Sequence, residues 1–244
     1  MDFLNGRIRP IFFKYLAAAF GSAVITSIYS IVDMAMVGQY QGPDGTAALA
    51  VVAPIWNIVY SLGLLMGIGG SVIFSTLKGQ EGRKDQEAHE IFTTSVIGAI
   101  VLALLAWFVV VVFDEQLLML FGAEEKLLPL GLSYLQPIQY VVPFFLLNQM
   151  LSAYLRNDND PTLATIGVLA GGIFNIFGDY FFVFVMDMGI YGAGLATAMG
   201  AVISFVILML HFVKKTNTLK LKKPTHFVEK ITKISITGFS TFFY

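Results

Sequence analysis

The sequence predicts an all-α membrane protein: a bundle of six transmembrane helices followed by the start of a seventh. The first observation is composition, because 57% of the 244 residues are hydrophobic and only 13% are charged, whereas soluble domains carry about 25% charged residues. The second is that the apolar residues gather in long runs, and a helix needs about 20 of them to cross a bilayer. The third is that alternating segments of about ten residues, which a membrane β-barrel would require, are absent from the sequence.

Six apolar runs follow one another along the chain, each long enough to span a bilayer as a helix. The first is too long for a signal-peptide core and lacks a small-residue cleavage site, so we expect it to remain as a helix. In the fourth run, Pro137 and Pro143 indicate bends, because a proline ring removes a helical hydrogen bond. A seventh run begins near Ile231 and the sequence ends within it at Tyr244. The six runs cover 11–38, 47–77, 91–113, 128–155, 161–186 and 192–213.

The cations of the connecting segments divide unequally between the two ends of this bundle. One end receives all the Lys and Arg residues except Lys126, including Arg156 and the lysines between Lys214 and Lys233. Because cytoplasmic loops of membrane proteins carry an excess of Lys and Arg, this end is expected to be cytoplasmic. The sequence therefore predicts a multi-pass protein of the plasma membrane with a cytoplasmic N-terminus.

Two carboxylates fall well inside apolar runs. Asp33 lies in the first run, and Asp179 lies in the fifth, four residues after Asn175. Residues four apart share one face of a helix, so Asn175 and Asp179 are expected to point the same way. A carboxylate inside a bilayer costs about 3 kcal/mol on insertion scales, and the sequence places no cation within the helices to pair with either one. Such carboxylates can stay neutral by holding protons, or can coordinate a cation or a cationic substrate.

An intramembrane enzyme is a weaker interpretation of the same sequence. The chain has no cysteine, and its polar residues do not follow metal-ligand spacing. A membrane serine protease would need a Ser and a His at depth in facing helices; Ser22 is present, but His211 lies near the end of the sixth run, where we expect a solvated or interfacial side chain. We therefore expect a protein that is not an enzyme and that needs no cofactor. Its expected partner is the lipid bilayer, and we expect no binding of nucleic acid.

Four stretches of the sequence form a further pattern. Residues 29–55 read YSIVDMAMVGQYQGPDGTAALAVVAPI, 78–88 read KGQEGRKDQEA, 151–164 read LSAYLRNDNDPTLA, and 175–198 read NIFGDYFFVFVMDMGIYGAGLATA. In this order they resemble the first helix and its exit, the first cytoplasmic loop, the link between helices four and five, and the Asn-x-x-x-Asp helix of multidrug and toxic compound extrusion (MATE) transporters. The resemblance covers residues 1–213.

The resemblance implies roles for individual residues. In the branch of the family typified by DNA-damage-inducible protein F, a first-helix Asp and a fifth-helix Asn and Asp are associated with a protonation network, alongside a fourth-helix Asn and a sixth-helix Thr. Many members have a proline directly after the fifth-helix Asp, where this chain has Tyr180, a candidate for the supporting network or the substrate cavity. The matching network positions in this chain are Asp33, Asn175, Asp179, Asn148 and Thr197.

The resemblance also implies a domain organisation. Family members have twelve helices in two six-helix lobes related by an axis along the membrane normal. Residues 1–213 would form the N-terminal lobe, 214–230 the cytoplasmic loop that links the lobes, and 231–244 the start of helix seven. We therefore expect a C-terminally truncated transporter, or the product of an incomplete or frameshifted gene, with the C-terminal lobe as its missing partner.

The activity that the resemblance implies is cation-coupled antiport, driven by H⁺ or Na⁺, which exports amphipathic or cationic organic compounds in multidrug efflux. Protons taken up at Asp179 and Asp33 would remove the attraction for a cationic compound. One alternative is a flippase of lipid-linked precursors from the same wider superfamily, which would need a cavity rich in Arg or Lys for pyrophosphate. Another is a half-size transporter that needs a partner, or a non-transporting fragment.

Overall fold

The computed structural model describes residues 8–80 and 84–239, and in this part of the chain all regular structure is helical. The all-α prediction is therefore confirmed for the described residues. A π-helical segment, Tyr180–Val185, follows α7, and a short 3₁₀ segment, Leu210–Val213, follows α8. The helices are α1 (Ile8–Gln41), α2 (Pro43–Lys78), α3 (Asp85–Val112), α4 (Asp114–Leu120), α5 (Leu128–Gln139), α6 (Val142–Asn157), α7 (Pro161–Asp179), α8 (Gly189–Met209) and α9 (Phe227–Gly238).

Four helical segments of the described chain are long and apolar enough to cross a membrane: α2, α3, α7 with its π-helical extension, and α8 with its 3₁₀ extension. Helices α5 and α6 pass the same test only as a pair, which raises the number of spans to five if the pair is one broken span. A helical bundle of membrane type is thus confirmed, whereas the predicted number of six spans is not.

The break between α5 and α6 confirms the bend that the prolines predict. The helix axis changes direction by 61° at the break between α5 and α6. Pro137 lies inside α5, near its end, and Pro143 lies in the first turn of α6, where a missing N–H costs nothing because that group has no helical partner. The fourth predicted run is therefore two helices rather than one.

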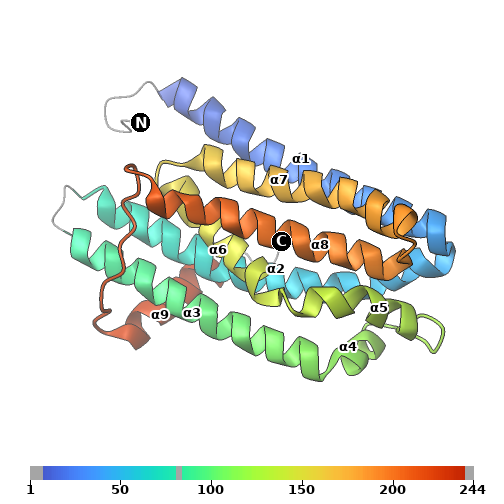
Figure 1. The fold of residues 1–244 in the computed structure, drawn as a ribbon. Coiled ribbons are helices and arrows are strands. Elements are labelled where there is room, and N and C mark those ends of the chain that lie inside the picture. Colours follow the sequence, from blue (N-terminus) through green and yellow to red (C-terminus); the bar gives the residue numbers. More distant parts are fainter. Residues whose placement is uncertain (1–7, 81–83, 240–244) are drawn as a thin grey trace.

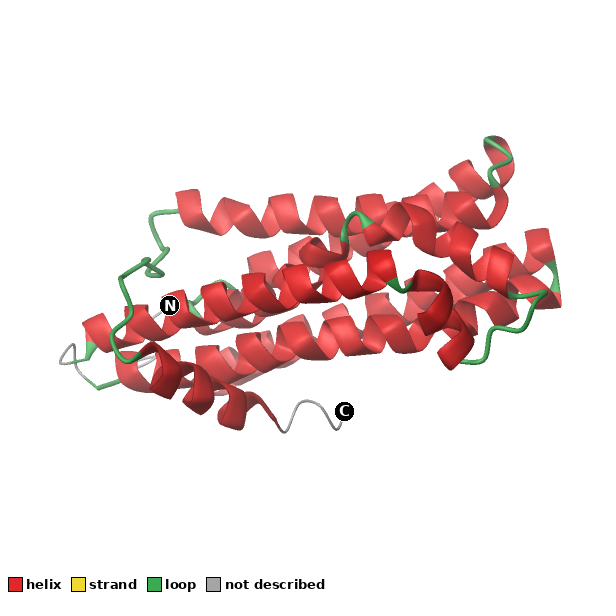
Figure 2. Cartoon of the chain, turned by 90° about the horizontal axis from the view of Figure 1, so that it is seen from below, coloured by secondary structure: helices red, strands yellow, loops and turns green. Residues whose placement is uncertain are grey.

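The helices lie side by side along one long axis (Figures 1 and 2). Neighbours in the bundle include α1 with α7, α7 with α8, α2 with α6, and α2 with α3. We call the end that holds the connections 158–160 and 214–226, on the left of Figure 1, the basic end. The opposite end, where α1 turns into α2 and α4 into α5, is the far end.

Two elements differ from their predicted boundaries. The connection at 114–127 contains the short helix α4, which is anchored by the fully buried Leu118. Helix α9 begins at Phe227, inside the predicted loop 214–230, and it packs against α2 and α3. Of the predicted seventh helix, residues 240–244 lie outside the described residues, as do residues 1–7 at the start of the predicted lobe.

Helices α2 and α6 touch through a glycine. A Cβ atom added to Gly63 would lie 2.5 Å from the carbonyl oxygen of Leu146 and 2.8 Å from Cβ of Gln149. Real Cβ atoms do not approach a backbone oxygen so closely, so glycine lets the two helices reach the separation that buries their facing side chains.

Replacing Gly63 by Ala is expected to lower the free energy of unfolding by about 1–3 kcal/mol, the usual cost of overpacking a well-packed interior. Thermal unfolding in detergent micelles measures this loss of stability as a Tm lower than that of the native chain. The matched control is Gly79→Ala, because Gly79 has a helical φ of −70° and its added Cβ would lie 3.5 Å from the nearest atom, the Ser75 carbonyl oxygen. Equal Tm values for the two variants would contradict the close contact.

The segment 214–226, which we call the strap, crosses the basic end from α8 to α9 (Figure 1). It is fastened by three polar side chains, one in the α6–α7 connection and two on α3. The backbone N–H of Thr218 donates to Asp158 at 2.9 Å, that of Lys222 donates to the Thr93 hydroxyl at 2.9 Å, and that of Thr225 donates to Glu90 at 2.9 Å. The strap is therefore held along its length rather than free in solvent.

The prediction that His211 is solvated or interfacial is wrong. Its side chain is fully buried between two carboxylates of the α6–α7 connection, with Nε2 2.7 Å from Asp158 and Nδ1 3.1 Å from Asp160. The α8 helix ends where these carboxylates lie, and an imidazole between two acidic groups is favoured because it can donate to both when protonated. Burial acts to raise the pKa of Asp160, but the hydrogen bonds from Lys214 and His211 outweigh it and leave that pKa below its ordinary value.

Candidate functional site

The two carboxylates of the apolar runs lie in one network of hydrogen bonds. Asp33 on α1 is 6% exposed, and Asp179 at the end of α7 is fully buried. The hydroxyl of Tyr134, on α5, donates to Asp33 Oδ2 at 2.7 Å and lies 3.4 Å from Thr197 Oγ1 on α8. Asn175 Nδ2 donates to that Thr197 oxygen at 3.0 Å and to Asp179 Oδ1 at 3.4 Å. We call these five residues the carboxylate network.

The directions of these hydrogen bonds follow from the donors available. Tyr134 has a single hydroxyl hydrogen, and Asp33 takes it, so Thr197 must be the donor in its contact with Tyr134. Thr197 in turn accepts from Asn175. The bonds therefore run outward from Asn175, one directly to Asp179 and the others through Thr197 and Tyr134 to Asp33, and the aligned bonds on the path to Asp33 strengthen one another. A change in protonation at either carboxylate alters the acceptor at one end of the same chain of bonds.

The local sequence of α7 accounts for one half of the network. Asn175 and Asp179 are four residues apart and share a face of the helix, as their spacing predicts. Directly after Asp179 the helix continues as the π-helical segment Tyr180–Val185. Such segments are rare and frequently occur at functional sites.

Several oxygen atoms of this region have no hydrogen-bond partner among the described residues. They are Oδ1 of Asp33, Oδ2 of Asp179, and the amide oxygens of Asn175 and Asn148, and all are buried. A buried polar atom without a partner costs about 1–3 kcal/mol, and more when it is charged. A proton or a cation at the two carboxylates would relieve this cost, so the arrangement suits groups that bind and release a cation.

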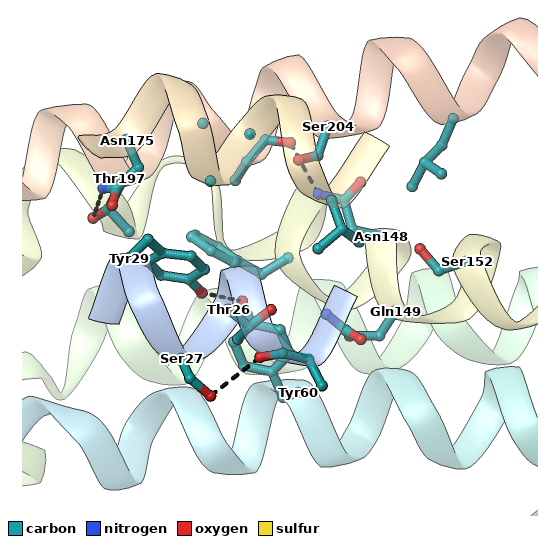
Figure 3. Close-up of a pocket in the computed structure, with 18 of the residues that line it drawn as sticks. Thr26, Ser27, Tyr29, Tyr60, Asn148, Gln149, Ser152, Asn175, Thr197 and Ser204 are labelled. Atoms are coloured by element: carbon teal, nitrogen blue, oxygen red, sulfur yellow. Dashed lines mark hydrogen bonds between the residues drawn. The ribbon is translucent and has the colours of Figure 1, made fainter. Parts of the chain in front are cut away.

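A cavity of about 500 Å³ lies beside the network, with walls from α1, α2, α6, α7 and α8 (Figure 3). Asn175 and Thr197 belong to both the network and the cavity wall. Tyr29 and Tyr60 form part of the same wall, with their hydroxyl oxygens 3.3 Å apart. A molecule in this cavity would therefore contact the network through Asn175 and Thr197.

The remaining residues that the sequence singled out take two different places. Asn148 lines the cavity and donates from Nδ2 to the carbonyl oxygen of Ala201 at 2.9 Å. Tyr180 lies apart from both the cavity lining and the network, with 58% of its surface exposed and its ring 6.0 Å from that of Phe184.

Two residues of the site were missed by the sequence interpretation. Tyr134 carries no signal in its local sequence, because its contact with Asp33 joins positions 101 residues apart. Arg156 was assigned to a connection, but α6 continues to Asn157, and Arg156 in its last turn lines the cavity. The expectation that no cation lies within the helices is therefore wrong, and the cause is a helix that extends beyond its apolar run.

Comparison with known proteins agrees on one family. The MatE family model matches residues 18–181. The multidrug export protein MepA of Staphylococcus aureus (strain MRSA252) is 28% identical over 221 residues, which are 88% of this chain and 49% of MepA. The chain thus spans about half the length of the curated relatives it matches.

Solved structures share the fold. A structure described as "Crystal structure of MATE in the straight conformation" matches with a TM-score of 0.84 at 20% identity, over 95% of this chain and 52% of that one. An "Outward-facing conformation of a multidrug resistance MATE family transporter of the MOP superfamily" matches with a TM-score of 0.80 at 20% identity, over 91% of this chain and 50% of that one. At these identities the likeness shows the fold alone.

Proposed function

Because this chain belongs to the MatE family, we propose that it supplies the N-terminal lobe of a cation-coupled antiporter that exports amphipathic organic compounds. The observation that carries the proposal is the carboxylate network beside the cavity. Two buried carboxylates, each with an oxygen that lacks a partner among the described residues, are joined by hydrogen bonds to two residues of the cavity wall, Asn175 and Thr197.

In the proposed mechanism, protons load Asp179 and Asp33 and thereby change the network that borders the cavity. When Asp33 is protonated it becomes a donor, so the hydroxyl of Tyr134 no longer needs to point at it. Thr197 and Asn175 can then reorient, which alters the hydrogen bonds offered to a bound compound. Na⁺ at the same carboxylates would act on the same residues, and no other cofactor enters the proposal.

The proposed topology has six spans. Helix α1 is 34 residues long, about 50 Å at 1.5 Å per residue, which is enough to cross a bilayer. Together with the four single spans and the bent pair it makes six. Among the described residues, the basic end carries nearly all the loop cations, which supports a cytoplasmic N-terminus in the plasma membrane. The second lobe of the transporter is the proposed partner, because the matched relatives are about twice as long as this chain.

A chimaera tests the proposal. Residues 1–213 replace the matching lobe of MepA, with the junction directly before the strap, and the chimaera is expressed in a bacterial strain that lacks its own efflux pumps. We expect ethidium efflux that stops when the cation gradient is collapsed with an ionophore. The control is MepA cut and rejoined at the same junction. A chimaera that inserts and folds but exports nothing, while that control remains active, would overturn the proposal.

The alternatives predict other results in the same strain. Efflux by the 244-residue chain alone, with crosslinking between its copies, would favour a half-size transporter over a lobe that needs its partner. A flippase of lipid-linked precursors would move such a lipid without ethidium efflux. Of the described residues that line the cavity, Arg156 is the only Lys or Arg, which falls short of the cation-rich wall expected for pyrophosphate.

A further inference from the structure

The strap presents a positive surface that no acidic residue of its own offsets. Its residues 214–226 include five lysines and no Asp or Glu. One of them, Lys214, pairs with Asp160 at 2.7 Å. The other four have exposed side chains with no ion pair among the described residues, and we call them the unpaired strap lysines: Lys215, Lys220, Lys222 and Lys223.

The backbone beneath these lysines is held in place. Its N–H groups at Thr218, Lys222 and Thr225 donate to side chains of the bundle, and Leu219 is buried against the bundle. The lysine side chains make none of these contacts, so they are displayed outward from a fixed backbone. A partner of opposite charge would therefore not have to order the backbone of the strap when it binds, which lowers the entropic cost of binding.

The length of α3 places the strap at the depth of the lipid headgroups. Helix α3 has 28 residues, about 42 Å at 1.5 Å per residue, whereas the hydrocarbon core of a bilayer is about 30 Å thick. The excess lies at the start of α3, because residues 85–90 are mostly polar and the rest is mostly apolar. Glu90 and Thr93, which fasten the strap, lie within about 12 Å of that start. The lysines beside them are therefore level with the phosphate groups.

Exposed apolar side chains accompany the cations. Leu221, between Lys220 and Lys222, is 68% exposed, and Val213 and Val228 at the two ends of the strap are 81% and 74% exposed. Cations interleaved with exposed apolar groups are typical of segments that lie in the membrane interface, where the apolar groups enter the acyl region and the cations meet phosphates. An acidic protein surface would match the lysines but leave these apolar groups in water.

We propose that the strap is a binding surface for anionic phospholipids, with the headgroup phosphates on the unpaired strap lysines and the acyl chains beside Leu221. The inference goes beyond the proposed export. It requires only that the basic end lies at a membrane surface, and it does not depend on the carboxylate network or the cavity. Lipids bound there would fasten the segment that connects α8 to α9 to one leaflet of the bilayer.

The test uses the purified 244-residue chain in detergent micelles that contain equal amounts of phosphatidylglycerol, which is anionic, and phosphatidylcholine, which has no net charge. Native mass spectrometry counts the molecules of each lipid that the chain retains. The native chain is expected to prefer phosphatidylglycerol by about fivefold or more, since one lysine near an anionic surface contributes about that factor. The preference should fall as the salt concentration is raised, because exposed charges are screened.

Two combined variants test the charge. The first removes it, should lower the preference by about fivefold, and consists of Lys215→Gln, Lys220→Gln, Lys222→Gln and Lys223→Gln. The second keeps the charge, should keep the preference, and consists of Lys215→Arg, Lys220→Arg, Lys222→Arg and Lys223→Arg.

A pair of single variants gives the matched control. Lys220→Gln should lower the preference for phosphatidylglycerol, whereas Lys126→Gln, which removes an exposed cation at the far end, should leave it unchanged. The backbone bonds of the strap do not involve the lysine side chains, so all these variants are expected to unfold at the Tm of the native chain.

An unchanged preference in the glutamine variant would overturn the inference, and so would an equal loss in Lys126→Gln and Lys220→Gln. If the glutamine variant does not fold, the native chain decides: equal retention of the two lipids overturns the inference and leaves the lysines for an acidic protein partner. The chimaera ends its share of this chain at residue 213, before the strap, so its result bears on the proposed export alone.

Discussion

Replacing Asp179 by Asn is expected to abolish cation-coupled efflux by the chimaera that carries residues 1–213, to the level of cells with an empty vector. Asparagine has nearly the same shape as aspartate but cannot bind and release a proton or hold a cation by charge. The residue is fully buried and its Oδ1 accepts from Asn175, and an amide oxygen can still accept that bond. The substitution therefore removes the titration while it keeps the packing.

The measurement is ethidium efflux under an imposed cation gradient, with the amount of chimaera in the membrane determined in parallel. Asp44→Asn is the matched control, because Asp44 lies near the start of α2 at the far end, pairs with the exposed Lys126 and is outside the network. This control should export like the parent chimaera. Undiminished efflux in Asp179→Asn would show that coupling does not depend on this carboxylate.

Replacing Asp158 by Ala is expected to lower the free energy of unfolding by about 3–5 kcal/mol, the usual cost of breaking a buried charged pair from one side. Asp158 is 2% exposed and accepts from the imidazole of His211, from the backbone of Thr218 and from the hydroxyl of Thr218. Its removal leaves the buried His211 imidazole with Asp160 as its one remaining carboxylate neighbour, and leaves the half-buried donors of Thr218 without this acceptor. It also frees the start of the strap from the α6–α7 connection.

Thermal unfolding of the purified chain in micelles measures this effect, and limited proteolysis reports cleavage within 214–226. Asp44→Ala is the comparison, because its pair with Lys126 has side chains that are 42% and 76% exposed, and such surface pairs contribute about 0–1 kcal/mol. The Asp158 variant should unfold at a clearly lower temperature and be cut in the strap. Similar Tm values for the two variants would show that the strap is not fastened at Asp158.

The family likeness and the helices could be predicted because both depend on short stretches of sequence. An apolar run long enough to cross a bilayer specifies a helix whatever its neighbours are, and a proline marks a bend through its own ring. The pair Asn175 and Asp179 was found in the same way, since a spacing of four fixes a shared face within one helix. Coupling roles for these residues and for Asp33 remain predictions that the efflux measurements address.

The sequence by itself determined the class of protein, the order of its helices, the unequal charge of the two ends and one half of the carboxylate network. Only the tertiary structure decided that Tyr134 joins Asp33 to Thr197, that His211 is buried between two carboxylates, and that Arg156 lines the cavity. The physical reason is that helical periodicity relates residues a few positions apart, whereas these contacts join residues 51 to 101 positions apart. Which residues meet in these contacts depends on how the helices pack against one another, and that packing depends on side chains throughout the bundle.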